Sequence, residues 1–301
     1  MLEIKRLRLL RELSVRGSVV AVAEALRYSP SAVSQQLAIL EREIGTPLLT
    51  RSGRHLQLTP AAKTLVRETE RLLDDVERVE ATMRAVTETV SGTLRVAAFQ
   101  TAILALLPQV LRRMAAEYPD VRVELVQHEP EAALRETWAR GFDLVIAEHY
   151  PGHAAEHFRG LDRRALTRDR IQLAVPADDD GPIAPGTVRA LEDAAALPWV
   201  MEPRGAASRH WAEQQCRVAG FEPDVRFETA DLQAHARLVE SGNAVALLPS
   251  LVHAGAAPRV RLVDLPGDPR RTVFTAAREA SALSPALTAL RTLLREAAEA
   301  E

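Results

Sequence analysis

The chain has 301 residues, enough for two or three domains, and its 47% hydrophobic and 26% charged residues are typical of folded globular proteins. No run approaches the roughly 18 apolar residues of a membrane helix, and residues 1–6 lack a secretory signal, so we expect a cytoplasmic protein that has no membrane partner. The lone cysteine, Cys216, excludes an intramolecular disulfide.

The charge is distributed unevenly along the chain. Residues 1–58 hold nine lysines and arginines against five acids, a net charge of +4, which leaves −7 for the rest of a chain whose total is −3. A basic N-terminal segment joined to an acidic body predicts that only the first part meets phosphate.

The first 45 residues predict three short helices. A helical stripe of leucines ends at Gly17, and Ser18 is a good N-cap for a second helix with Val19, Val20, Val22, Ala23 and Leu26 inward. Ser29 and Pro30 are the expected N-cap and first residue of a third helix, which ends at Gly45. Its apolar positions Val33, Leu37 and Leu40 follow helical spacing.

A hairpin and a long helix are expected next. Residues 48–51 and 55–58 flank a glycine-containing turn, and Thr59 and Pro60 repeat the cap-plus-proline signal. The long helix carries a heptad seam made of Leu65, Thr69, Leu72, Val76, Val79, Met83, Val86 and Val90. Packing on its own chain is one way to bury this seam, and dimerisation is the interpretation we favour.

Beyond Gly92 the pattern changes to strands that alternate with helices. We expect strands at 93–99, 121–126, 142–147 and 171–175, then at 199–201, 225–228 and 245–248. The expected helices are 102–118, 131–140, 208–219 and 232–241. This alternation predicts an α/β fold with a parallel sheet, and the segment 92–301 is long enough for two lobes.

The second and third helices have the spacing of a helix-turn-helix, whose second helix enters the major groove of DNA. With the apolar positions facing the core, its outward side chains would meet base edges, and the hairpin would be a wing that places cations near phosphate. The expected DNA-binding residues are Ser29, Ser31, Ser34, Gln35 and Ala38 on the helix and Arg51, Arg54 and His55 on the wing.

Three runs of residues carry a resemblance to a known family. Residues 17–26, 29–37 and 40–51, followed by Thr59-Pro60-Ala61-Ala62, resemble the N-terminal domain of LysR-type transcriptional regulators. The resemblance implies a winged helix-turn-helix (1–58), a long linker helix (59–91) and a two-lobed effector domain like periplasmic binding proteins (92–301). Lobe I would be 92–166 with 269–301, and lobe II 167–268, the chain crossing between them near 166–169 and 265–268.

The resemblance also implies a small-molecule effector, here a carboxylate or amino acid, in the cleft between the lobes. Loops at the carboxyl ends of strands should line that cleft. Thr101 and Arg204 could hold an anionic group, and Glu148 or Glu202 an amino group. The expected effector-binding residues are Gln100, Thr101, His128, Glu148, Glu202, Arg204 and Thr229.

The family pattern further implies a homodimer that assembles into a homotetramer. It also implies binding to double-stranded DNA at an interrupted palindromic operator, and RNA polymerase is a further partner to consider.

Two departures from the family pattern affect the operator sequence that we expect. Pro30 sits one position earlier than is usual, so the contact position has no glutamine, and Gln35 stands where arginine is frequent.

Two other classes of protein are less well supported. An enzyme is disfavoured because no nucleophile elbow, Walker or dinucleotide motif occurs, so no catalytic residue and no cofactor is expected. His128, Glu148, His149, His153 and His157 invite a metal site, but they lack a ligand framework and none is expected. An exported solute-binding protein would fit the α/β body but not the N-terminal helix-turn-helix.

Overall fold

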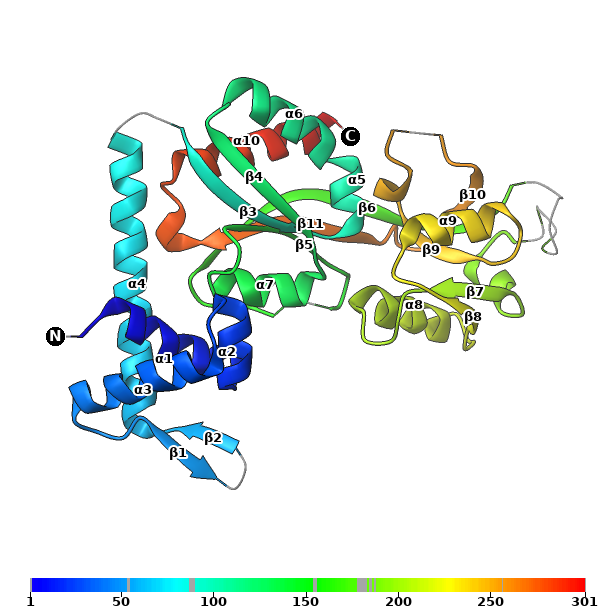
Figure 1. The fold of residues 1–301 in the computed structure, drawn as a ribbon. Helices are drawn as coiled ribbons and strands as arrows, with labels where there is room; N and C mark the ends of the chain where they lie inside the picture. Colours follow the sequence, from blue (N-terminus) through cyan, green and yellow to red (C-terminus); the bar gives the residue numbers. More distant parts are fainter. Residues whose placement is uncertain are drawn as a thin grey trace. The chain divides into compact units, whose positions relative to one another are not determined.

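The computed structural model describes residues 2–52, 55–86, 90–153, 156–177, 183, 186, 188–255 and 257–300. The chain divides into two compact units, Met1–Val86 and Thr87–Glu301 (Figure 1). Among the described residues, no helix is long and apolar enough to cross a membrane.

The first unit begins with three helices around one apolar core: α1 (Ile4–Arg16), α2 (Val19–Leu26) and α3 (Pro30–Ile44). The predicted caps are confirmed, since the Ser18 hydroxyl accepts from the Ala21 N–H and the Ser29 hydroxyl from the Ala32 N–H. These side chains satisfy backbone donors that a helix start leaves unpaired, so they fix where α2 and α3 begin.

The inward face predicted for α2 needs one correction. Val22 and Ala23 are buried, but the side chain of Val20 is 55% exposed. An eight-residue helix makes little more than two turns, so adjacent positions 19, 20, 22 and 23 cannot all face one core. The helix ends at Arg27, which takes the left-handed conformation with φ 58°.

The hairpin is confirmed as strands β1 (Leu49–Ser52) and β2 (His55–Leu58), paired antiparallel. It is tied to α3 by Glu41, whose carboxylate accepts the backbone N–H groups of Leu48 at 2.8 Å and Leu49 at 3.0 Å. Thr59 then caps the next helix, its hydroxyl accepting from Ala62 and donating to the Pro47 carbonyl.

The long helix α4 (Pro60–Val86) spans 27 residues, and the face that the heptad seam predicts is largely open to solvent. The exposed members are Leu72 (40%), Val76 (36%), Val79 (63%), Met83 (56%) and Val86 (69%). Thr69 is buried instead, and its hydroxyl donates to the Leu65 carbonyl. The extension of the seam to Val90 is wrong, because Val90 lies outside the helix and packs on the core of the second unit.

The second unit contains a mixed sheet that belongs to two lobes. In lobe I, β3 (Gly92–Ala98) pairs in parallel with β4 (Val121–Gln127) and β5 (Leu144–His149), and β11 (Arg270–Arg278) runs antiparallel to β5. Two helices, α6 (Leu107–Glu117) and α10 (Pro285–Ala300), share a core with one face of this sheet, and α7 (Pro130–Trp138) shares a core with the other (Figure 1).

Two predictions for lobe I are corrected by the structure. The single helix expected at 102–118 is two helices, α5 (Gln100–Ala105) and α6, because Pro108 in the first turn of α6 has no N–H to continue a helix through Leu106. The sheet is mixed rather than parallel because β11 and β6 (Leu161–Pro176) enter it antiparallel.

Strand β6 connects the lobes without a break. Its residues 161–170 pair with β11, and its residues 171–176 pair with β9 (Ala246–Pro249) and β10 (Val260–Val263). The first crossing therefore falls at Arg170 and Ile171, and the return crossing lies between β10 and β11.

Lobe II completes its own core around this second half of β6. Its other elements are β7 (Pro198–Met201), α8 (Ala207–Val218), β8 (Asp224–Glu228) and α9 (Leu232–Glu240). Among the described residues of the second unit there are also short 3-10 segments: η1 (Leu191–Ala194) and η2 (Ser250–His253) in lobe II, and η3 (Glu279–Ser281) after β11 in lobe I. The thiol of Cys216 is buried in lobe II, and burial raises its pKa to about 12, so it is a structural group.

Candidate nucleic-acid interface and ligand cavity

The outer face of α3 carries a row of exposed small and polar side chains. Val33, Leu37 and Leu40 are buried in the core of the first unit, which turns the opposite face of the helix outward. The five residues singled out on this helix are all exposed: Ser29, Ser31, Ser34, Gln35 and Ala38.

The N-terminal end of α3 is tightly organised. The Ser29 hydroxyl, besides capping the helix, lies 3.0 Å from the Ser31 hydroxyl. Arg42, a turn after Ala38 on the same helix, is also exposed. Short hydroxyl, amide and methyl groups at the start of a helix suit close approach to base edges in a major groove.

The predicted wing is the hairpin that follows α3. Arg51 lies on β1 and His55 lies on β2, the two paired strands of that hairpin. Arg54 lies outside the described residues. The roles expected for these three side chains stay predictions.

The second unit contains a cavity of about 290 Å³ between its two lobes. Lobe I contributes the start of α7 and the end of β5, and lobe II contributes the turn from β7 into α8. The described lining residues are Glu129, Pro130, Glu131, Glu148, His153, Glu202, Pro203, Arg204, Gly205, Ala206, Ala207, Ser208 and Ala230.

Three of the expected effector residues meet at this cavity: Glu148, Glu202 and Arg204. The other four do not line it. The Thr101 side chain is fully buried and its hydroxyl accepts from Arg271 at 2.6 Å. His128 packs edge-on against Phe142, and the Thr229 hydroxyl accepts from the Asp231 N–H.

Gln100, the remaining one, joins the two lobes. Its amide donates to the Asp231 carboxylate at 2.7 Å and accepts from the Leu232 N–H at 2.8 Å. Asp231 is the N-cap of α9, so the contact ties the start of α5 in lobe I to the start of α9 in lobe II. The hydrogen bond from Gln100 lowers the pKa of Asp231, which keeps this carboxylate ionised.

Behind the cavity wall lies a buried ionic cluster centred on Arg271 of β11. Its guanidinium pairs with Asp169 of β6 at 2.6 Å, pairs with Glu148 of β5, and lies 5.1 Å over the Phe99 ring. Burial raises the pKa of the Glu148 carboxyl to about 7, although Arg271 acts to lower it. Glu148 therefore belongs to both the cluster and the cavity lining.

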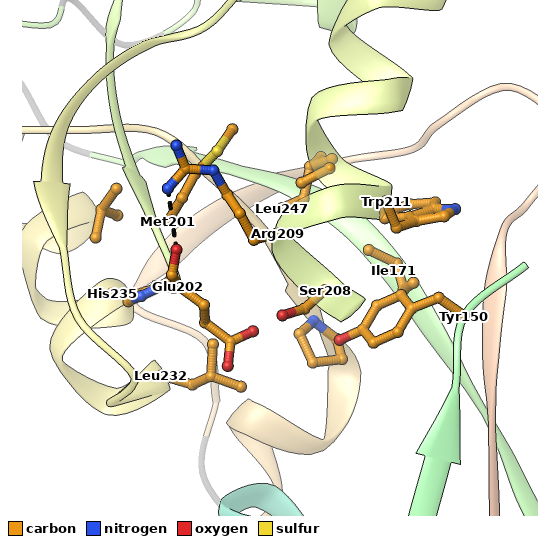
Figure 2. A pocket seen from close by; sticks show the side chains of 13 residues that line it. Tyr150, Ile171, Met201, Glu202, Ser208, Arg209, Trp211, Leu232, His235 and Leu247 are labelled. Carbon is orange, nitrogen blue, oxygen red and sulfur yellow. Dashed lines mark hydrogen bonds between the residues drawn. The ribbon is translucent and has the colours of Figure 1, made fainter. Parts of the chain in front are cut away.

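Glu202 has a different environment. Figure 2 shows its carboxylate extending toward Ser208 and Leu232, in a tight space beside the cavity. Burial raises the pKa of Glu202, and a hydrogen bond with Ser208 acts to lower it. The neighbouring Arg209 bonds the Glu202 backbone carbonyl and pairs with Glu213 and Glu228, so it does not neutralise the Glu202 side chain.

Several residues of the cavity and its wall were not predicted from the sequence. Glu129 and Glu131 follow the carboxyl end of β4, a signal that was available. Ser208 lies in the first turn of α8. Arg271 is 123 residues from Glu148 and 170 from Thr101, and only the folded sheet brings them together.

Two family models together match nearly the whole chain. Residues 4–63 match the model described as bacterial regulatory helix-turn-helix protein, lysR family. Residues 87–299 match the model described as LysR substrate binding domain.

Curated relatives and solved structures agree with these matches. The chain is 29% identical over 259 residues to the transcriptional dual regulator GltC of Bacillus subtilis, covering 86% of this chain and 84% of that protein. A full-length OxyR variant from Pseudomonas aeruginosa matches with a TM-score of 0.68 and 19% identity over 98% of this chain and 95% of that one. CbnR complexed with its target DNA matches with a TM-score of 0.54 and 23% identity over 99% and 100%.

Proposed function

Because the chain belongs to the LysR family of DNA-binding transcription regulators with a substrate-binding effector domain, we propose specific roles for its two units. The first unit reads an operator through α3, and the second holds a small effector between its lobes. The observation that supports this assignment is the row of exposed small and polar side chains on α3, whose opposite face is buried in the core.

At the operator, Ser31, Ser34, Gln35 and Ala38 meet base edges. Glutamine offers a donor and an acceptor to adenine, serine does either, and alanine offers a methyl to thymine. Ser29 orients the helix start as its cap. On the wing, Arg51, Arg54 and His55 neutralise phosphate, which positions the head without selecting sequence.

The protein acts as a homodimer formed through α4, and dimers pair into a tetramer. Five apolar side chains on one face of this helix are exposed, and burying each leucine or valine contributes about 1.5–3 kcal/mol. Two heads held together this way contact the half-sites of an interrupted palindrome. We place the divisions of the chain at residues 58 and 91, and the lobe bounds at Arg170–Ile171 and between β10 and β11. A cytoplasmic location completes the assignment.

The effector occupies the cavity that Glu148, Glu202 and Arg204 line. Both lobes contribute to its walls, so a ligand there binds one lobe arrangement better than another and shifts the population toward it. The contact of Gln100 in lobe I with Asp231 in lobe II is a polar contact that such a shift rearranges. The effector then changes DNA binding by the free energy that couples the cavity to the DNA-binding surface of the first unit.

The test of the operator assignment is a footprint of the protein on the DNA upstream of its own gene. Two protected half-sites are expected, and Gln35→Ala should weaken binding by about 1–3 kcal/mol and relax preference at one base pair. Gln109→Ala, a glutamine on α6 of the second unit, is the matched control and should bind as the unchanged protein does. Equal loss in both variants, or no protected half-sites, would refute the assignment.

A further inference from the structure

The charge of the cavity lining is strongly one-sided. Of the described lining residues, Glu129, Glu131, Glu148 and Glu202 carry carboxylates, while Arg204 is the single arginine. Arg204 is exposed, and His153, the other basic group, lies 3.6 Å from the Glu131 carboxylate. Arg271 behind the wall pairs with Glu148, but the carboxylates of the lining still outnumber the cations, so the field inside the cavity attracts positive charge.

Glu202 adds a second, independent observation. Within the described part of the chain, its carboxylate takes part in no ion pair, although Glu202 is partly buried; the Ser208 hydroxyl is its neutral partner. A carboxylate withdrawn from water without a cation is costly, and a carboxyl group in a cleft whose pKa is shifted by burial is typical of a binding site.

The arrangement of the carboxylates favours an organic cation over a metal ion. Among the described residues, no three histidine, cysteine, aspartate or glutamate side chains are placed to hold a metal. Ca²⁺ needs six to eight oxygens at 2.3–2.6 Å, whereas an ammonium group needs acceptors for only three N–H bonds. The volume of about 290 Å³ is at the small end of ligand pockets.

We propose that the effector of this regulator is a small organic amine, whose ammonium group lies between Glu202 of lobe II and Glu148 of lobe I. This inference rests on the proposed effector cavity and adds to it the charge class of the ligand. It replaces the carboxylate that the sequence suggested at Thr101, whose hydroxyl already accepts from Arg271.

An ammonium group at this place would join the two lobes through charge. Glu148 also faces Arg271 of β11, Asp169 of β6 and Glu129 at the start of α7. A cation adds a second positive charge to this cluster and favours the ionised form of Glu148, whose pKa is about 7. Amine affinity should therefore rise between about pH 6 and pH 8, since the amine itself stays protonated over that range.

The test compares three five-carbon probes on the full-length protein: 1,5-diaminopentane, 1,5-pentanediol and glutarate, each to ~10 mM, which detects a Kd of ~1 mM. The diamine should raise Tm by roughly 3–6 °C at ten times its Kd, and the other two should not. Glu202→Gln should abolish the shift, whereas Glu192→Gln, an exposed carboxylate on η1 away from the cavity, should keep it.

A second readout needs no ligand. If the Glu202 carboxylate binds the cation of a ligand, Glu202→Gln should leave the Tm of the ligand-free protein unchanged or raise it. A Tm lower than that of Glu192→Gln would mean that the Glu202 charge stabilises the fold, and it would overturn the inference. No diamine shift would overturn it as well. Glutarate could instead raise Tm, and the cavity-filling variant Ala207→Trp could abolish that rise. This result would overturn the inference that the effector is a cation but would support the effector cavity itself.

Discussion

Arg271 is the centre of a buried ionic cluster in the second unit. It is fully buried, and it connects β11 to Asp169 on β6, Glu148 on β5 and Thr101 on α5. A buried charge is tolerated only when it is paired and hydrogen-bonded, so the Arg271 guanidinium depends on these partners together.

Replacing Arg271 with methionine should destabilise the second unit by about 3–5 kcal/mol, because two carboxylates are left buried without their cation. The measurement is the Tm of the second unit in a calorimetric scan. Arg226→Met is the matched control, because its pair with Asp224 is about half exposed and should contribute less than ~1 kcal/mol. Similar losses in the two variants would contradict the role of Arg271.

Arg27 is the residue that turns the chain from α2 into α3, in a left-handed conformation at φ 58°. A non-glycine residue there costs about 1–3 kcal/mol, and glycine removes that cost while adding unfolded-state entropy.

Arg27→Gly should therefore raise the stability of the first unit by roughly 0.5–1 kcal/mol, measured by urea unfolding. Arg27→Ala removes the same charge but keeps the strain, so it should not stabilise. If alanine stabilises as much as glycine, the gain comes from charge and the conformational explanation is wrong.

At the scale of elements, local signals predicted boundaries well and pairing poorly. Ser18, Ser29 and Thr59 mark helix starts because a cap acts within three residues. The break between α5 and α6 was visible in Pro108 and was overlooked. Only residues 171–175 of β6 were predicted as a strand, and β11 was missed entirely, because their arginine-rich sequences are stabilised by partners a hundred residues away.

Helix α4 makes the clearest prediction about an element. Its exposed apolar face lacks a partner within the described part of its own unit, so we expect a second copy of the chain to cover it.

Leu72→Asp combined with Val79→Asp should convert the dimer to monomers, because two charges would be buried at the seam. Sedimentation velocity measures the change. Ala85→Asp, an exposed position of α4 outside the seam, is the control and should remain dimeric. An unchanged sedimentation coefficient in the double variant would exclude the seam as the dimer interface.

At the scale of the whole molecule, the lining of the cavity between the lobes was predicted only in part from the sequence. The rule that ligands bind at the carboxyl ends of strands placed Glu148, Glu202 and Arg204 correctly on the cavity. It could not distinguish them from Thr101 and Gln100, whose side chains are occupied by Arg271 and Asp231 from remote segments. Which polar group is free depends on tertiary partners, and those are not encoded in local spacing.

The two units differ in net charge as well as in fold. Residues 1–86 carry a net charge of +3, which suits phosphate, and residues 87–301 carry −6, which suits neither DNA nor an anionic ligand. Recognition of DNA by the first unit should therefore depend steeply on salt, whereas the second unit should not bind DNA.

The most direct test is the equilibrium affinity of the full-length protein for DNA upstream of its own gene, compared with scrambled DNA of equal length, at several salt concentrations. We predict a clear preference for the upstream DNA and a linear fall of log K with log salt, with a slope of about −0.9 for each phosphate contacted. Equal affinity for both DNAs, or affinity that does not change with salt, would contradict the account.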